Sequence, residues 1–170
     1  MPDAIVRPSA RILLVDDERR ILLYRGLGMT KNSGYAWFTP GGGVKDGETV
    51  NQAGARELRE ETGHSVALEE LGRIVATSSG HWYSADGRLF LSLDSFFFLR
   101  VRRLEVDTSG MEGFEQSMID RFHWWSLPEL HGTGEQVIPL GLTGLLSRLL
   151  TGDVPDEPVV FPWHHPDPSA

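Results

Sequence analysis

Residues 42–64, which read GGVKDGETVNQAGARELREETGH, constrain the fold of this chain more than any other stretch. Thr49 and Gln52 have the spacing of a helix capping box, in which each side chain bonds the backbone of the other residue. Gly63 stands where a left-handed cap would end the helix. The stretch therefore predicts a glycine-rich turn followed by a helix over about residues 50–62.

Three glutamates of this helix lie on the wrong side for ordinary surface charges. At about 100° of rotation per residue, Glu57 and Glu61 fall in the middle of the apolar side, with Glu60 at its edge. Arg56 and Arg59 are expected on the solvent side. Because like charges at i, i+4 repel each other and carboxylates near a helix C-terminus oppose the helix dipole, a positive group should lie among them. Oxygen ligands at this spacing suit Mg²⁺ or Mn²⁺, and an ion-pair patch is the alternative.

The charged positions of this stretch resemble the Nudix box, G-x5-E-x7-R-E-U-x-E-E-x-G-U, where U is a bulky aliphatic residue. Gly42, Glu48 and residues 56–63 match the box, whereas His64 departs from it, and Val66 is expected to supply the missing packing. The resemblance covers about residues 10–150. It implies an α/β fold, the Nudix α/β/α sandwich with a mixed β-sheet between helices; the pattern alone indicates only α/β or α+β.

The resemblance also implies roles for individual residues. Glu60 and Glu61 are the leading metal ligands, and Glu57 is either a third ligand or the base that activates water. Gly41 is the expected backbone ligand of the metal. Arg56 is expected to orient the glutamates through charge-assisted hydrogen bonds, and so it joins the catalytic candidates.

Family members often take a further carboxylate from a loop beyond the box. Glu112, Glu115 and Asp120 are the options here, and Glu115 is favoured because it precedes the strand that leads into a pair of tryptophans. The alternative is that each is a solvated loop charge.

Substrate contacts are expected from two further places. Gly42 and Gly43 have no Cβ, so their backbone can pass close to a phosphate. Trp82 and Tyr83 fall in a predicted turn over residues 79–87 and could stack on a nucleobase, although aromatic residues are more often part of a core.

The activity that follows from the resemblance is pyrophosphohydrolysis. A nucleoside diphosphate linked to a moiety X would be cleaved to a nucleoside monophosphate and phosphorylated X, with Mg²⁺ or Mn²⁺ as cofactor. The identity of X stays open among nucleoside triphosphates, dinucleoside polyphosphates and nucleotide sugars. The alternative function is a catalytically silent nucleotide-binding regulator, which usually lacks some of the box glutamates.

Composition bounds the remaining possibilities. The chain has 170 residues, 40% of them hydrophobic, which fits one domain over residues 1–152 followed by a proline-rich tail over residues 153–170. The tail is expected to be extended or partly ordered, packed on the domain or on a neighbouring subunit, so a homodimer stays open. The absence of cysteine excludes thiolate metal sites and the isopentenyl-diphosphate isomerases of the superfamily, which are understood to need a catalytic cysteine.

Charge and targeting signals point to the expected partners and location. A formal net charge of −8 disfavours a nucleic acid polymer as partner and leaves a small nucleotide acceptable. Neither a signal sequence nor a membrane-spanning run is evident, which predicts a cytoplasmic protein without membrane contact.

The rest of the chain predicts a sheet and a second helix. Residues 11–15 and 20–24 read as a hairpin, and residues 35–39, 71–78, 88–93, 95–101 and 119–125 read as further strands. Leucines recur at i, i+3, i+4, i+7 and i+8 from Leu142 to Leu150, which predicts an amphipathic helix.

Overall fold

The computed structural model describes residues 3–27, 34–113 and 118–165. The elements follow one another in the order β1 (Ile5–Val15), β2 (Ile21–Leu27), β3 (Tyr35–Phe38), β4 (Gly41–Gly43), α1 (Val50–Thr62), α2 (Leu68–Leu71), β5 (Ile74–Tyr83), β6 (Leu89–Arg100), β7 (Ile119–Trp125), α4 (Leu127–Gly132), β8 (Val137–Ile138), α5 (Leu142–Leu150) and β9 (Val159–Val160). Within the described ranges, no helix is long and apolar enough to cross a membrane.

The strands form one mixed sheet in the order β8-β3-β2-β1-β6-β5-β9, with β4 beside β1 and β7 beside β2. The predicted hairpin is confirmed, since β1 and β2 pair antiparallel with Val15 opposite Ile21. On its other side β1 pairs in parallel with β6 over its whole length, from Ile5 opposite Phe90 to Val15 opposite Arg100. This central position explains why β1 ends in a continuous apolar run: both of its faces are buried.

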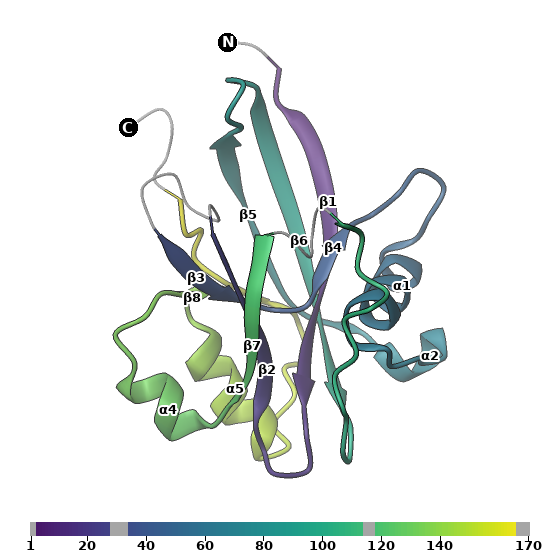
Figure 1. Cartoon of the computed structure of the whole chain (residues 1–170), viewed down its shortest axis with the longest axis vertical. Helices are drawn as coiled ribbons and strands as arrows, with labels where there is room; N and C mark the ends of the chain where they lie inside the picture. Colours follow the sequence, from purple (N-terminus) through teal and green to yellow (C-terminus); the bar gives the residue numbers. More distant parts are fainter. Residues whose placement is uncertain (1–2, 28–33, 114–117, 166–170) are drawn as a thin grey trace.

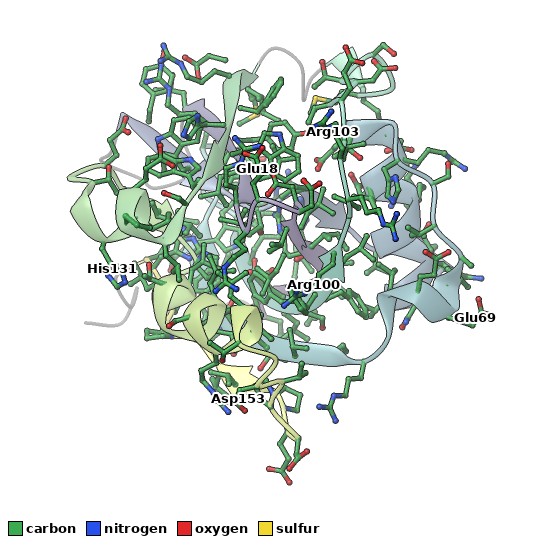
Figure 2. The ribbon with its side chains drawn as sticks, turned by 90° about the horizontal axis from the view of Figure 1, so that it is seen from below. Glu18, Glu69, Arg100, Arg103, His131 and Asp153 are labelled. Carbon is green, nitrogen blue, oxygen red and sulfur yellow. The ribbon has the colours of Figure 1, made fainter. Side chains whose placement is uncertain are left out.

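Two layers of helices cover the two faces of the sheet, as the sandwich requires (Figure 1). Ile12 and Leu14 of β1 join the core beneath α1, which includes Leu58. Leu13 and Val15, which point the other way, join the core beneath α5. From below, Glu69 of α2 and His131 of α4 lie at opposite edges of the molecule (Figure 2).

Local signals set the ends of α1 where they were predicted. Thr49 Oγ1 accepts a hydrogen bond from the backbone N–H of Gln52 at 3.1 Å, and Gln52 Oε1 accepts one from the N–H of Thr49 at 2.8 Å. Gly63 adopts φ 79° and ends the helix. Val66 packs against the core on the α1 side of the sheet, as expected from the departure at His64.

Three predicted boundaries are wrong. Leu71 ends the short helix α2 instead of starting a strand, and the two strands predicted at residues 88–93 and 95–101 are one strand, β6, which runs from Leu89 to Arg100. Trp82 and Tyr83 lie in β5 rather than in a turn, because β5 and β6 stay paired as far as Tyr83 opposite Leu89. The Trp82 indole stacks on the Phe90 ring, with 4.7 Å between centroids, and this contact supports the longer hairpin.

The described part of the tail runs along the sheet. Val159 and Val160 form β9, which pairs in parallel with β5 at the edge of the sheet. Phe161 is buried in the core beneath α5. Trp163 lies over Gly80 of β5 and donates its indole N–H to the carbonyl of His81 at 3.2 Å. The segment therefore covers the outer edge of the strand β5.

Candidate active site

The three glutamates of α1 lie as the helical periodicity predicts. Glu57 and Glu61 are 4% and 3% exposed, and the side chain of Glu60 is 20% exposed. Burying two carboxylates against a sheet is unfavourable unless each finds hydrogen bonds or positive charge. The stability of the site therefore depends on the hydrogen-bond donors and positive charges around these two carboxylates.

Glycines let the loop before α1 approach these carboxylates. A Cβ on Gly42 would lie 2.5 Å from Oε1 of Glu57, so any other residue there would displace that carboxylate. Gly41 has φ +140° and donates its N–H to Oε2 of Glu61 at 2.7 Å. The sequence predicted a glycine-rich turn here, whereas the structure shows that Gly41–Gly43 form a short strand, β4, which lies against the two side chains.

The placement of Arg56 on the solvent side is wrong. Its side chain is 14% exposed and lies across the carboxylates, with Nη1 at 2.8 Å from Glu57 Oε1 and 3.3 Å from Glu60 Oε2. Its Nη2 also donates to the carbonyl of Gly43 at 2.9 Å. Arg56 directly precedes Glu57, so its Cα lies near the edge of the buried side of α1. From there the long arginine side chain extends across the carboxylates.

Glu48 holds Arg56 in that place. Its carboxylate accepts from Nε of Arg56 at 2.8 Å and from Nη2 at 3.0 Å, and the N–H of Lys45 donates to it at 3.0 Å. The Arg56 guanidinium, followed by the Lys45 amide, lowers the pKa of Glu48 to about 2. In turn Glu48 and Glu57 raise the pKa of Arg56. Glu48 and Arg56 therefore both stay charged at neutral pH.

Tyr24 contacts Glu61, which the sequence did not predict. Its hydroxyl donates to the backbone carbonyl of Glu61 at 2.7 Å, and the residue is fully buried. Burial, followed by the charge of Glu61, raises the pKa of Tyr24, so the hydroxyl keeps its proton. The signal in the sequence is a tyrosine, with its polar hydroxyl, in the middle of the apolar strand β2.

The donor set suits a hard cation, but its side chains are not gathered around one point. Glu57, Glu60 and Glu61 provide carboxylate oxygens within little more than one helical turn, beside glycines that leave open backbone. In the ranges that the structure describes, no three acidic or histidine side chains are close enough to hold a metal ion as they stand. Arg56 lies between two of the three carboxylates. The residues therefore fit Mg²⁺ in chemistry, and binding it would require these side chains to rotate.

The candidates for a further carboxylate differ in their surroundings. Asp120 pairs with the guanidinium of Arg25, which lowers the pKa of Asp120. Glu112 is exposed and lies 3.8 Å from Nζ of Lys45. Glu115 lies outside the described residues.

Trp82 and Tyr83 differ in how accessible their rings are for stacking on a nucleobase. Trp82 is half-buried, stacks on Phe90 and donates its indole N–H to Ser92 Oγ at 2.9 Å. Tyr83 is 44% exposed at the end of the hairpin. The indole of Trp82 is thus already held by Phe90 and Ser92 of the neighbouring strand β6.

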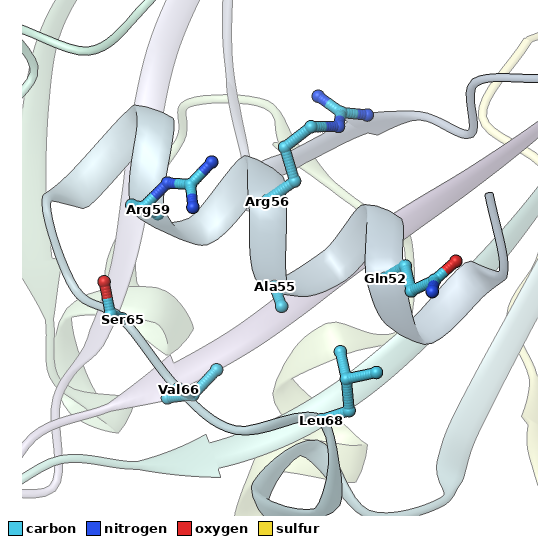
Figure 3. Close-up of a pocket in the computed structure, with 7 residues that line it drawn as sticks. All are labelled: Gln52, Ala55, Arg56, Arg59, Ser65, Val66 and Leu68. Atoms are coloured by element: carbon cyan, nitrogen blue, oxygen red, sulfur yellow. The ribbon is translucent and has the colours of Figure 1, made fainter.

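One hollow lies against α1, and another lies beside Tyr24 of β2. The smaller, of about 190 Å³, lies between the helix and the segment that follows it (Figure 3), and it is lined by Gln52, Ala55, Arg56, Arg59, Ser65, Val66 and Leu68. The larger, of about 530 Å³, is lined by Tyr24, Thr108, Met111, Ile119, Asp120, Arg121 and Phe122. Tyr24 lines the larger hollow and also bonds the backbone carbonyl of Glu61, so this one residue connects the hollow with α1.

Comparison with known proteins agrees with this geometry. Residues 6–140 match the family model described as NUDIX domain. The chain is 36% identical over 83 residues to an RNA pyrophosphohydrolase of Novosphingobium aromaticivorans, which covers 49% of each chain. It is 29% identical over 143 residues to an RNA pyrophosphohydrolase of Rickettsia africae, covering 75% of this chain and 80% of the relative.

The first of these alignments spans only about half the length of the relative. Among solved structures, a MutT protein from Methanosarcina mazei has the same fold, with a TM-score of 0.58 and 18% identity over 90% of this chain and 99% of that one. The match over residues 6–140 takes in nearly all of β1, the strands β2 to β8, the glycine loop and every glutamate of the cluster. The chain belongs to the Nudix family.

Proposed function

We propose that this protein is a metal-dependent pyrophosphohydrolase that cleaves a nucleoside diphosphate linked to X into a nucleoside monophosphate and phosphorylated X. The observation that carries the proposal is the pair of buried carboxylates, Glu57 and Glu61, held against glycines 41 and 42. The names of the relatives support the same bond type, since an RNA pyrophosphohydrolase also breaks a phosphoanhydride.

Glu57, Glu60 and Glu61 would hold Mg²⁺, with Mn²⁺ as a substitute. The carbonyl of Gly41, the further ligand expected from the resemblance, accepts a hydrogen bond from Nη1 of Arg11 at 3.2 Å. When bound, the metal neutralises diphosphate oxygens and lowers the pKa of water. Arg56 would keep Glu57 and Glu60 in place while a ligand is absent, because its guanidinium already bonds both. Gly42 and Gly43 would let the substrate phosphates approach the backbone, since neither presents a side chain.

The hollow beside Tyr24 is our candidate for the nucleoside. Its volume of about 530 Å³ falls within the usual range for ligand pockets of about 300–1,000 Å³. Phe122 in its wall is 43% exposed and presents a ring for stacking. Tyr83 stays a second candidate for that contact, and Trp82 a weaker one because its indole is already engaged. Phe122→Ala should raise KM more than Tyr83→Ala does, measured by steady-state kinetics.

The 5′ end of an RNA is a second candidate for the substrate, favoured by the names of the relatives. Only the terminal phosphates and the first nucleoside would need to enter the site. A net charge of −8 disfavours extended contact with the following phosphates. A screen of nucleotide-X compounds together with a short triphosphate-ended RNA, in Mg²⁺ and in Mn²⁺, separates the two candidates by the product released.

Substitution of the box glutamates tests the chemistry. Glu60→Gln and Glu61→Gln should each abolish most hydrolysis that depends on a divalent cation, because each removes a charge that would hold the metal. In chelator each variant should fold but unfold at a somewhat lower temperature, since Glu60 bonds Arg56 and Glu61 accepts the N–H of Gly41. Turnover by the wild type in excess chelator would contradict the proposal. A silent regulator would bind nucleotides and release no product from any of them.

The general base is either Glu57 or Glu115, and paired variants distinguish them. If Glu115 accepts the proton of water, Glu115→Gln should lower kcat by roughly 10²–10⁴-fold with little change in KM. If Glu57 is the base, Glu57→Gln takes that loss and Glu115→Gln stays within a few-fold of the wild type. The measurement is the pH–rate profile at saturating Mg²⁺, and an unchanged profile in Glu115→Gln would remove Glu115 from the catalytic residues.

A further inference from the structure

Arg11 is a charged residue in the middle of the sheet that none of the roles above includes. It lies in β1, where its Cα is opposite Gly41 of β4 and Phe96 of β6. Because side chains alternate along a strand, Arg11 shares a face with Leu13, which packs in the core beneath α5. Its guanidinium is thus on the face of the sheet that lies away from α1 and the glutamates.

The guanidinium holds the turn that leads into β4. Nη1 of Arg11 donates to the carbonyl of Thr39 at 3.3 Å and to that of Gly41 at 3.2 Å. The carbonyl between them, on Pro40, accepts the N–H of Ile12 at 2.9 Å. Two adjacent residues of β1 therefore fix three successive carbonyls of the turn.

The same turn carries the amide that holds Glu61. Gly41 donates its N–H to Oε2 of Glu61 at 2.7 Å, within a buried site. Its backbone passes so close to β1 that a Cβ on Gly41 would lie 2.1 Å from the carbonyl oxygen of Ala10. Since the turn is held by Arg11 on one face of the sheet and bonds Glu61 on the other, loosening the first contact should misalign the second.

We propose that Arg11 is a positioning residue for Glu61, acting through the backbone of Gly41. It fixes the direction of the Gly41 amide, and the amide in turn fixes the Glu61 carboxylate. The consequence for metal binding rests on the proposed function, in which Glu61 is a ligand. The consequence for the Gly41 amide does not depend on it.

Arg11→Met tests the proposal, because methionine keeps the aliphatic stem and removes the donors. Arg100→Met is the matched control: Arg100 also donates to a backbone carbonyl, that of Leu149 at 3.1 Å, from β6 near the end of α5. Residues that support metal ligands from outside typically alter metal affinity by about 10–100-fold. We expect Mn²⁺ affinity, measured by electron paramagnetic resonance, to fall about 10-fold in Arg11→Met, at the low end of that range because Arg11 acts through Gly41. It should stay at the wild-type value in Arg100→Met.

A second measurement needs no metal. In chelator, hydrogen exchange of the Gly41 amide, followed by NMR, should be about 10-fold faster in Arg11→Met than in the wild type and unchanged in Arg100→Met. Arg11→Lys keeps the charge and one donor nitrogen, so its exchange rate should fall between the two. If Arg11→Met does not fold, Arg11→Gln takes its place, since glutamine is too short to reach the turn.

The outcomes separate this proposal from the proposed function. An unchanged exchange rate of the Gly41 amide in Arg11→Met would overturn the role of Arg11, and so would an equal acceleration in the control. If Glu61→Gln abolishes Mn²⁺ binding, so that Glu61 is a ligand, then faster exchange with unchanged Mn²⁺ affinity in Arg11→Met would also overturn it, because Glu61 would then not depend on the turn. A wild type that binds no Mn²⁺ would refute the metal site, and the exchange rates would still decide whether Arg11 positions Gly41.

Discussion

The ion pair between Glu48 and Arg56 allows a quantitative test of how the acidic cluster is held. Glu48→Gln keeps the shape of the side chain and one acceptor oxygen. The amide nitrogen of the glutamine takes the place of the second carboxylate oxygen, which accepts a hydrogen bond from a guanidinium nitrogen at 2.8 or 3.0 Å. That amide nitrogen is a donor and cannot accept this bond. One charge-assisted hydrogen bond is lost, and two donors then face each other.

The expected cost follows from the number of bonds and their burial. A hydrogen bond to a charged group contributes about 1.5–3 kcal/mol to stability. The Glu48 side chain is 15% exposed and that of Arg56 14%, so solvent screens the pair little. For a chain of this size, each kcal/mol lowers the unfolding temperature by roughly 2–4 °C. Glu48→Gln should therefore melt about 3–12 °C below the wild type at pH 7.

The pH dependence has a defined sign. The folded-state pKa of Glu48 is lowered to about 2, against about 4.3 for an unfolded glutamate. A carboxylate with a lowered pKa stabilises the fold above the unfolded value, and this stabilisation is lost as pH falls toward the folded value. The difference between wild type and Glu48→Gln should be constant above about pH 5 and shrink to less than half near pH 3.

Urea denaturation at several pH values checks both statements. Glu18→Gln is the matched control, because Glu18 pairs with Arg20 at 3.2 Å but has a side chain that is 63% exposed. A surface pair of this kind contributes about 0–1 kcal/mol. If Glu48→Gln costs no more than Glu18→Gln, or if its cost does not change between pH 5 and pH 3, the reasoning about the cluster is refuted.

Two glycines give further predictions. Gly42→Ala should weaken Mn²⁺ binding, because its Cβ would lie 2.5 Å from Oε1 of Glu57. Gly43→Ala, whose Cβ would have nothing within 4 Å, should bind Mn²⁺ as the wild type does, and titration with Mn²⁺ compares the two variants. Gly80→Ala should displace the Trp163 indole, since the new Cβ would lie 2.2 Å from the ring. The measurement is tryptophan fluorescence, and an unchanged spectrum would contradict the packing of the tail on β5.

Sequence alone was sufficient for the helix α1 and for the side on which its acids lie. The caps at Thr49 and Gly63 are local signals, and the helical period then fixes Glu57 and Glu61 on the buried side. These features depend on residues within a few positions of one another. The α/β sandwich came from the resemblance of the box, because periodicity by itself could not order the strands.

Only the tertiary structure decided how the acids are held. Arg56 was placed in solvent because a helical wheel describes where a side chain starts and not where a long flexible one ends, whereas it reaches back to Glu48 and Glu57. Contacts to Glu61 come from Gly41 and Tyr24, which are 20 and 37 residues away in the chain. Such partners are set by the register of strands, and register arises when the whole sheet packs rather than from any local pattern.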